Sequence, residues 1–446
     1  MKKKVLASLL CVSMAAMLFA GCGSSSNGSN GTETGKSNSG SDKKVTIWSA
    51  ESVSKLTEEL ATKWVNENYP DYTVEVQSVG ETDAAKNVIT DVDGAADIYG
   101  FAQDQLARLV AAGALQPLTD EYKTWVTDNN DSGAATAATL DSMTYAFPMT
   151  SDNGYFLIYD KSVISDPSDL DQILKDCEDN GKQFYYEFTS AWYNAAVYLG
   201  AGAKCTFDID KEGNFTKANT NYASPEGVVA LRKLIDIANS PATVDASALT
   251  AITDTKNVGA FVGGAWTIND SKETKDPDGE PDSGDEESYV APGLKTILGD
   301  NFACAKLPSF TGSDGKSYQM SGFGGFKLMG IKPQKDAEKL KLCYELTKYL
   351  TDTDAQLQRY NTQGWGPSNI TAQQDSAVQS DVALTALREQ LEFMVPQGQY
   401  PNDWWDLVGD LIKTGDGDGY LTKDATDDQL MEILKNHDDT CASYCQ

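Results

Sequence analysis

Hydrophobic and polar positions divide this chain into three stretches with different patterns. Val5–Ala20 is an apolar run that follows three consecutive lysines. It is shorter than the roughly 20 residues of a membrane-spanning helix, and with the preceding charges it is typical of a signal peptide. Residues 23–41 are mainly Ser, Gly and Asn, which predicts a flexible linker. Order is expected from Lys43, where short apolar segments begin to alternate with amphipathic ones.

The alternating segments predict an α/β protein. Strands are expected at 45–48, 72–77, 96–100, 157–159 and 326–331, and helices at 53–68, 104–112, 169–180, 225–239 and 334–350. Strands that alternate with helices indicate a largely parallel sheet covered by helices, with ligands bound beyond the carboxyl ends of the strands. Residues 270–287 are rich in Pro, Gly and acids, which predicts a loop.

Length and charge narrow the class of protein. A chain of 446 residues is long enough for two lobes of roughly 150–200 residues each. The 66 acidic residues outnumber the 36 basic ones and give a formal net charge of -30. Nucleic acids and anionic lipid head groups are therefore excluded as partners, because both require clustered Lys and Arg. His437 is the single histidine, so the most common general base is nearly absent.

The end of the apolar run resembles the lipobox of bacterial lipoproteins. The sequence Leu18-Phe19-Ala20-Gly21-Cys22 places small residues before a cysteine, although Phe19 stands where the lipobox usually has Leu. The resemblance implies a signal peptide over residues 1–21 and lipid on Cys22, followed by a linker to residue 42. Removal of the three lysines would change the formal charge from -30 to -33. An ordinary cleaved signal with an incidental cysteine is the alternative.

Several segments, in this order, resemble the maltose-binding-protein-like family of extracellular solute-binding proteins. They are Lys44–Trp48, Asp97–Asp104, Leu109–Leu115, Tyr145–Pro148 with Leu157–Lys161, Gly259–Trp266 and Lys306–Phe310. The resemblance extends from about Lys43 to the C-terminus. It implies a two-lobed periplasmic-binding-protein-like fold, with hinge crossings and a ligand cleft between the lobes. The first lobe would hold residues 43–150 and 316–365, and the second 151–315 and 366–446.

The same resemblance implies a function. The chain would be the substrate-binding lipoprotein of an ABC importer, and not an enzyme. It would bind an oligosaccharide, with maltooligosaccharides the first expectation, and deliver it to the membrane permease subunits. It would act as a monomer, extracytoplasmic and anchored to the cell membrane through Cys22, without cofactor. Other solutes remain open, and the alternatives from other classes are a surface glycoside hydrolase and a surface adhesin.

Sugar-binding sites combine aromatic planes for the C–H faces with carboxylates and amides for the hydroxyls. In the first lobe, Glu51 follows the first strand, and Phe101 and Asp104 follow the third. The family places an aromatic and an acid at the latter position, although Asp104 would equally serve as a helix N-cap. Asp152 and Asn153 lie just past the inferred first crossing, where they are more polar than a buried crossing requires.

The second lobe contributes mainly tryptophans. Trp266 follows two glycines that would let the backbone approach a ligand, and the family has a sugar-stacking tryptophan at this position. Trp192 lies in a segment where the family has an aromatic platform, with a core position on a helix as the alternative. Adjacent residues on a helix point about 100° apart. One of Trp404 and Trp405 is therefore expected in the core and the other in the cleft, and Trp365 lies near the last inferred crossing.

The cysteines and the glycine-rich segments give weaker evidence about function. Six cysteines remain after Cys11 and Cys22, with 15 possible pairings, and Cys177 with Cys205 is a plausible pair because both belong to the second lobe. No Cys/His spacing typical of zinc is present, and Asp416–Gly419 lacks the later acid of a calcium loop. Gly322–Gly325 does not have the spacing of a dinucleotide loop and instead predicts backbone close to a cleft. We therefore expect no metal.

Overall fold

The computed structural model describes residues 43–210, 213–275, 287–414 and 419–445. The predicted signal peptide, Cys22 and the linker lie outside these residues, as does most of Asp416–Gly419. Residues from Asp42 onward form one compact unit. Within the described residues, no helix is both long and apolar enough to cross a membrane.

The first of two large sheets is built from the N-terminal strands. It has the order β19-β18-β3-β1-β2, and β6 also pairs with β18. β1 (Lys44–Ser49) runs parallel to β2 (Thr73–Ser78) and to β3 (Ile98–Ala102). β18 (Phe323–Ile331) runs antiparallel to β3 and to β6 (Ala146–Asn153), and parallel to β19 (Val395–Pro396). The prediction of a largely parallel sheet is therefore right for β1–β3 and wrong for the pairings of β18 with β3 and β6.

The second sheet has the order β11-β8-β12-β7-β15. Its strands are β7 (Phe156–Asp160), β8 (Gln183–Tyr185), β11 (Thr243–Val244), β12 (Val258–Gly263) and β15 (Phe302–Ala305). β8 is parallel to β11 and β12, whereas β7 is antiparallel to both of its neighbours. Each sheet is covered on its faces by apolar clusters of its own, so the fold is the two-lobed α/β arrangement that the sequence predicts.

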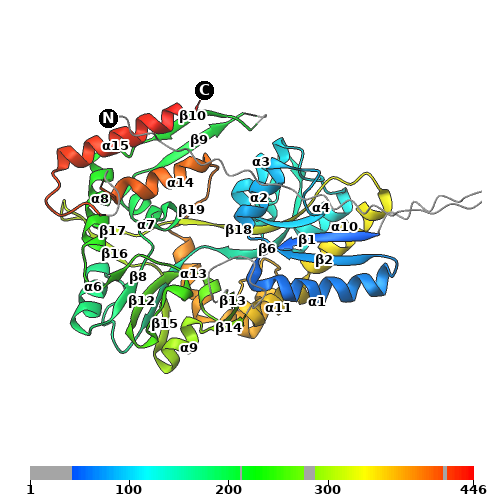
Figure 1. Cartoon of the computed structure of the whole chain (residues 1–446), viewed down its shortest axis with the longest axis horizontal. Coiled ribbons are helices and arrows are strands. Elements are labelled where there is room, and N and C mark those ends of the chain that lie inside the picture. Colours follow the sequence, from blue (N-terminus) through cyan, green and yellow to red (C-terminus); the bar gives the residue numbers. More distant parts are fainter. Residues whose placement is uncertain (1–42, 211–212, 276–286, 415–418, 446) are drawn as a thin grey trace, which may run out of the picture. The chain divides into compact units, whose positions relative to one another are not determined.

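The chain connects the two sheets several times. β6 of the first sheet leads within three residues into β7 of the second, and the chain returns from β15 to β18. After α11 (Thr353–Gln363) it reaches α13 (Val382–Leu391), which packs on β15 and β7. Figure 1 shows β6 and β18 in the centre, between α1 and β2 on one side and β8 and β12 on the other. These two strands are therefore the structural link between the sheets.

The five predicted helices are present as α1, α3, α6, α8 and α10, and capping residues mark the starts of several helices. In α8 (Pro225–Ala238), Ser224 accepts a hydrogen bond from the Gly227 N–H and proline occupies the first turn. α15 (Asp427–Ser443) begins with a complete capping box of Thr426 and Gln429. The remaining α-helices are α1 (Glu51–Asn68), α2 (Glu81–Thr90), α3 (Leu106–Ala111), α4 (Asp120–Asn129), α5 (Ser132–Ala137), α6 (Leu170–Asp179), α7 (Ala191–Ala201), α9 (Leu294–Leu298), α10 (Ala337–Leu350), α12 (Ser376–Ser380) and α14 (Asn402–Gly409).

The smaller strands form antiparallel pairs outside the two sheets. They are β4 (Thr139–Leu140) with β5 (Met143–Thr144), β9 (Cys205–Ile209) with β10 (Phe215–Thr220), β13 (Ser271–Lys275) with β14 (Glu287–Ala291), and β16 (Ser309–Thr311) with β17 (Ser317–Gln319). The prediction of one loop over residues 270–287 is therefore wrong at both ends, because backbone pairing there outweighs the turn-forming composition. Residues 276–286 lie outside the described residues.

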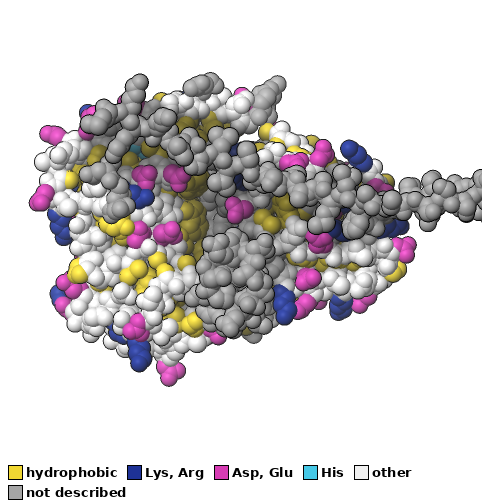
Figure 2. Space-filling view, in the orientation of Figure 1, with side chains coloured by type: hydrophobic (Ala, Val, Ile, Leu, Met, Phe, Trp, Pro, Cys, Tyr) yellow, Lys and Arg dark blue, Asp and Glu magenta, His cyan; other side chains and the backbone are white. Residues whose placement is uncertain are grey.

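The cysteines do not pair as the sequence suggested. All six cysteines in the described part of the chain are free thiols. Cys177 packs beside Gly259 of β12, whereas Cys205 faces Cys441 of α15 with the sulfur atoms 3.9 Å apart. A shared lobe is therefore not enough to identify a pair. On the surface, acidic side chains are scattered over the coloured part of the face in Figure 2, consistent with the excess of acids in the sequence.

Candidate functional site

Three tryptophans from three different segments meet in one cavity, which we call the indole pocket. Trp192 comes from α7, Trp266 from the short 3-10 helix η4 (Ala265–Thr267), and Trp405 from α14. The cavity has a volume of about 350 Å³, within the range of small-molecule sites. Its remaining lining residues are Glu81, Ala102, Asp104, Gln105, Asn153, Lys327 and Gln397.

The polar side of the indole pocket lies at the carboxyl ends of parallel strands. Glu81 follows β2 at the start of α2, and Asp104 and Gln105 follow β3 in the 3-10 helix η1 (Gln103–Gln105). Parallel strands bring their carboxyl ends to the same sheet edge, which is where open α/β sheets bind ligands. The strand order therefore gathers these side chains from different parts of the sequence.

Trp266 owes its position to Gly264, two residues earlier in the chain. A Cβ atom at Gly264 would lie 2.1 Å from the indole ring of Trp266, so the ring folds back over this residue. The sequence led us to expect these glycines to admit a ligand to the backbone, but the structure shows that Gly264 makes room for the indole. The ring then lies 5.9 Å from that of Trp192, tilted by 45°.

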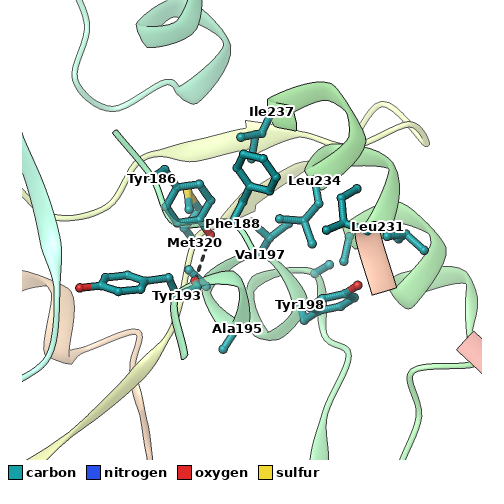
Figure 3. Close-up of a cluster of buried hydrophobic side chains, with 14 of the residues drawn as sticks. Tyr186, Phe188, Tyr193, Ala195, Val197, Tyr198, Leu231, Leu234, Ile237 and Met320 are labelled. Atoms are coloured by element: carbon teal, nitrogen blue, oxygen red, sulfur yellow. Dashed lines mark hydrogen bonds between the residues drawn. The ribbon is translucent and has the colours of Figure 1, made fainter. Parts of the chain in front are cut away.

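Trp192 is held by contacts on both sides. Its indole N–H donates to Oε1 of Gln397 at 3.0 Å, and its ring meets Tyr155 edge-on at 4.6 Å. The rest of α7 packs in the core: Figure 3 shows Val197 and Tyr198 near Leu231 and Leu234, while the ring of Tyr193 projects away from that cluster. The hydroxyl of Tyr186 donates to the Tyr193 carbonyl at 2.9 Å, which ties the start of the helix to the preceding segment.

Among the described residues, Lys327 is the single cation that lines the indole pocket. Its Nζ lies 4.0 Å from the ring centroid of Trp365, 5.4 Å from that of Trp266 and 3.7 Å from Oε1 of Glu81. A buried ammonium needs such partners, and cation–π contacts together with the carboxylate supply them. Trp365 is itself buried and does not line the pocket, so it supports the site through Lys327.

Asp104 has an unusual electrostatic environment. It is buried, its Oδ1 has no hydrogen-bond partner, and its Oδ2 accepts from the side-chain amide of Gln105. Burial raises the pKa of Asp104 from 3.8 to about 7, against the lowering effects of Gln105 and of the Arg108 charge. The alternative interpretation of Asp104 as a helix cap is wrong, because no side chain caps η1 or α3.

Unpartnered acceptors concentrate around this pocket. Oε1 of Glu81 and Oδ1 of Asp104 are buried without a hydrogen bond. A second cavity of about 400 Å³ adjoins the pocket, since both are lined by Asp104 and Gln397, and it contains two more such oxygens, on Gln103 and Gln399. Buried acceptors without donors are costly. These four oxygens therefore favour a ligand that brings hydrogen-bond donors.

A larger cavity of about 530 Å³ has a different lining, and we call it the leucine cavity. Asp152 lines it together with Gly324, Gly325, Leu384, Leu387 and Leu391. Oδ2 of Asp152 accepts from the Gly366 N–H at 2.6 Å, while Oδ1 has no partner. Burial raises the pKa of Asp152, opposed by the charge of Lys327. No tryptophan contributes to this lining, so we do not assign it the sugar site.

The structure brings some predicted site residues together and separates others. Asp104, Asn153, Trp192, Trp266 and Trp405 line the indole pocket. Asp152 lines the leucine cavity instead, and Trp365 lies behind Lys327. The remaining three predicted residues lie elsewhere.

Phe101, Trp404 and Glu51 do not contact the pocket. Phe101 is fully buried in β3 beside Tyr99, because the inward-facing position of a central strand belongs to the core. Trp404 is 1% exposed and stacks on Tyr400 at 4.0 Å, so it is the core member of its pair. Glu51 is exposed in the first turn of α1.

Four lining residues were missed by the sequence reasoning: Glu81, Gln105, Lys327 and Gln397. The rule that selected Glu51 also applies to Glu81, which starts the helix after the second strand. A lysine within the apolar run of β18 is itself a signal, since an isolated charge there requires a buried partner. Gln397 lies in a segment without periodicity, where no sequence signal identifies it.

Comparisons with known proteins agree with this architecture. The sequence profile of the family described as bacterial extracellular solute-binding protein matches residues 61–386. No curated protein matches the sequence significantly. Among solved structures, the maltodextrin binding protein MalE1 from L. casei BL23 is 22% identical with a TM-score of 0.68, covering 90% of this chain and 98% of that one.

Two further solved structures have the same fold. The Thermus thermophilus maltotriose binding protein, bound with maltotriose, is 15% identical with a TM-score of 0.69, covering 90% of this chain and 100% of the other. The maltose-maltodextrin binding protein of Alicyclobacillus acidocaldarius is 17% identical with a TM-score of 0.66, covering 89% and 100%. The fold is thus the two-lobed arrangement of these proteins.

Proposed function

Because this chain belongs to the bacterial extracellular solute-binding proteins, we propose that it binds an oligosaccharide in the indole pocket and hands it to an ABC importer. A maltooligosaccharide or related α-glucan is the first candidate. The solved structures of similar fold include proteins titled as binding maltodextrin and maltotriose, which supports this choice.

The proposal rests on one observation: buried oxygens without a hydrogen bond lie next to the indole planes of the pocket. Glu81 and Asp104 each present a buried oxygen without a hydrogen bond next to Trp192 and Trp266, although that of Glu81 lies 3.7 Å from the Lys327 ammonium. A sugar supplies hydroxyl donors to such oxygens and C–H faces to the indoles. An anionic solute would meet two carboxylates with one lysine already engaged, which disfavours it.

A second function, glycoside hydrolysis, has one specific observation in its favour. Two carboxylates line the same pocket, and the pKa of about 7 at Asp104 is suited to a general acid. The family is one of substrate-binding proteins, which supports binding without turnover. Prolonged incubation with maltooligosaccharides, followed by chromatography, distinguishes the two: a binding protein returns the sugar intact, whereas shorter products would establish hydrolysis.

The binding proposal is tested by calorimetric titration against a panel of neutral oligosaccharides and anionic solutes. We expect saturable binding of α-linked glucose oligomers at one site. Trp64→Ala provides a matched control, because Trp64 packs on Tyr349 outside the pocket, and its affinity should equal that of the unaltered chain. Binding of only anionic solutes, or of no member of the panel, would contradict the proposal.

The lobe boundaries and the closure of the cleft are part of the same proposal. We infer lobes of residues 43–150 with 316–365 and of 151–315 with 366–446, linked by the crossings at β6 and β18. Rigid lobes joined by short crossings close around a ligand. Small-angle scattering should therefore give a smaller radius of gyration with saturating sugar than without it.

We also propose attachment to the cell membrane through lipid on Cys22, with the permease subunits as partners. The proposal rests on the sequence alone, from Leu18 to Cys22 and the following linker. Cys22→Ala should release the protein into the medium, whereas Cys343→Ser, which alters a cysteine buried in α10, should leave it cell-bound. Retention of the Cys22→Ala protein in the membrane fraction would contradict lipid anchoring.

A further inference from the structure

Three side chains with metal-binding chemistry meet in the core next to the C-terminal helix. His437 and Cys441 are four residues apart on α15, so they share one face of the helix. Cys205, the first residue of β9, faces them from a position 236 residues away from Cys441 in the sequence. The exposed fraction is 1% for His437, 0% for Cys441 and 4% for Cys205, so this cluster lies in the core.

Two of the three separations are close to those of a tetrahedral thiolate–imidazole site. The ligand atoms of Cys205, His437 and Cys441 all lie within 4.8 Å of one another. The two sulfur atoms are 3.9 Å apart, and Nε2 of His437 is 3.4 Å from the Cys441 sulfur. Bond lengths of about 2.3 Å to sulfur and about 2.0 Å to nitrogen at tetrahedral angles require separations of about 3.5 to 3.8 Å.

The surroundings fix the imidazole in the orientation that a metal requires. Nδ1 of His437 lies 2.9 Å from Oδ1 of Asp438, whose carboxylate also accepts from Thr220 Oγ1 at 2.6 Å and from the Ala223 N–H at 3.0 Å. Tyr222 stacks on the ring at 4.3 Å. A carboxylate that holds Nδ1 leaves Nε2 as the ligand atom, which is the usual outer arrangement of zinc-bound histidine.

We propose that Cys205, His437 and Cys441 bind one Zn²⁺ ion. Two thiolates neutralise its charge, a requirement for a buried ion. Binding releases the two thiol protons, and the three side chains supply three of four tetrahedral positions, the donor set that leaves one to water. The ion would fasten α15 to the β9-β10 hairpin and thereby stabilise the second lobe.

A disulfide between Cys205 and Cys441 is the competing use of the same thiols. It requires a sulfur–sulfur distance near 2.05 Å, much shorter than the observed 3.9 Å. It would also leave unexplained why His437 directs Nε2 at the Cys441 sulfur while Asp438 holds the other nitrogen. The orientation of His437 therefore favours the ion over the bond.

Cobalt titration of the fully reduced full-length protein tests the proposal, because Co²⁺ reports tetrahedral thiolate coordination by its absorption. We expect one equivalent to give thiolate-to-cobalt charge-transfer and tetrahedral ligand-field bands, and Zn²⁺ to displace it. Cys205→Ser and Cys441→Ser should abolish the spectrum. Cys343→Ser, which alters a buried cysteine of α10, should keep it and serves as the matched control.

Folding and redox state are measured alongside. Circular dichroism of each variant shows whether loss of the spectrum accompanies unfolding, and His437→Gln offers a second disruption with both thiols kept. Zn²⁺ should raise the melting temperature of the reduced, unaltered chain by several degrees, and that of Cys441→Ser by none. A folded, reduced chain without cobalt bands overturns the proposal. So does Cu⁺ binding without Zn²⁺ binding, or a Cys205–Cys441 peptide cross-link in protein isolated without reductant.

Discussion

The two cavities beside β6 and β18 differ in chemistry although consecutive residues line them. On β6, Asp152 lines the leucine cavity and Asn153 lines the indole pocket. On β18, Phe326 lines the leucine cavity and Lys327 lines the indole pocket. Successive strand residues point to opposite faces, so one crossing separates two environments. The larger cavity combines glycines and leucines with polar side chains such as Asp152 and has no tryptophan among its described lining residues, whereas the smaller one combines three indoles with two acids. Volume alone therefore does not identify a ligand site.

Removal of the central indole should have the largest effect. Trp266→Ala is expected to weaken oligosaccharide binding by about 30- to 1000-fold, since truncation of a desolvated aromatic contact costs on the order of 2–4 kcal/mol. The folded state should keep most of its stability. Calorimetric titration measures the first quantity and urea unfolding the second.

Trp404→Ala is the matched control for that substitution. Trp404 is buried against Tyr400 in the core, so its loss should lower the free energy of unfolding by roughly 3–5 kcal/mol. The remaining folded protein should bind sugar normally. The reverse pattern, with Trp266→Ala mainly unstable and Trp404→Ala mainly defective in binding, would exchange the roles assigned to the two residues.

Asp104→Asn should have the next largest effect on binding. A hydrogen bond from a sugar hydroxyl to the ionised carboxylate is worth roughly 1.5–3 kcal/mol, so the affinity at pH 8 should fall about 10- to 150-fold. With a pKa of about 7, the unaltered protein should also lose affinity as the pH is lowered from 8 to 5. A pH-independent affinity would show that Asp104 does not contact the ligand in its charged form.

The same carboxyl should make the unliganded protein less stable at neutral pH. Its folded pKa of about 7 lies above the ordinary 3.8, so between these values the folded state holds a proton that the unfolded chain releases. Stability should therefore fall by a few kcal/mol as the pH rises from about 4 to 7, since one pKa unit corresponds to about 1.4 kcal/mol. Urea unfolding of Asp104→Asn across this range should show a flatter dependence, and an unchanged slope would contradict the assignment.

Gly264→Ala should disturb the indole pocket without removing a ring. The added methyl group would overlap the Trp266 indole, while the backbone at φ -103° is open to alanine. Overpacking typically lowers stability by about 1–3 kcal/mol. If about 1–2 kcal/mol of contact with the ligand is lost as the ring moves, binding should weaken by roughly 5- to 30-fold. Gly315→Ala strains a turn with positive φ outside the pocket lining, so it should lower stability and leave the affinity unchanged. Unchanged affinity in Gly264→Ala would mean that the ring position is not important for binding.

The smallest effect should come from the neighbours on β6. Asn153→Ala removes a polar side chain from the indole pocket, and the loss of one neutral hydrogen bond should weaken binding by about 2- to 10-fold. Asp152→Asn alters the leucine cavity and should change affinity less than twofold. Equal losses in the two variants would show that the ligand extends through both cavities.

Local chemistry explains which elements were predictable. The parallel strands β1–β3 and the long helices α1, α8 and α10 follow from apolar periodicity and from capping residues such as Ser224 and Asp336. The antiparallel strands β6 and β18 were not recognised as such, because strand direction depends on how the chain returns between sheets. β13 was assigned to a loop because its stability comes from pairing with β14 and not from its own composition.

The residues of the candidate site likewise fall into a predictable group and an unpredictable group. The sequence predicted that acids follow parallel strands and that tryptophans lie near the crossings. Five of the ten predicted contact residues line the indole pocket. Phe101 was predicted as a contact but lies in the core, because an aromatic residue has the same sequence signal in a core as in a cleft. One of Trp404 and Trp405 was expected in the core, and the structure places Trp404 there. Which of Trp404 and Trp405 faces the pocket depends on the rotation of α14 against its neighbours.

The sequence by itself predicted the two-lobed α/β class, export by a signal peptide, and the kinds of side chain that a sugar would contact. The α/β class and the signal peptide follow from periodicity and composition, which are properties of short segments, whereas the two lobes and the sugar-contacting positions were implied by the family resemblance. Only the tertiary structure decided that Glu81, Lys327 and Gln397 join the indole pocket, and that Cys205 meets His437 and Cys441. The physical reason is that burial and pairing are set by contacts between residues far apart in the chain, and no local pattern specifies those contacts.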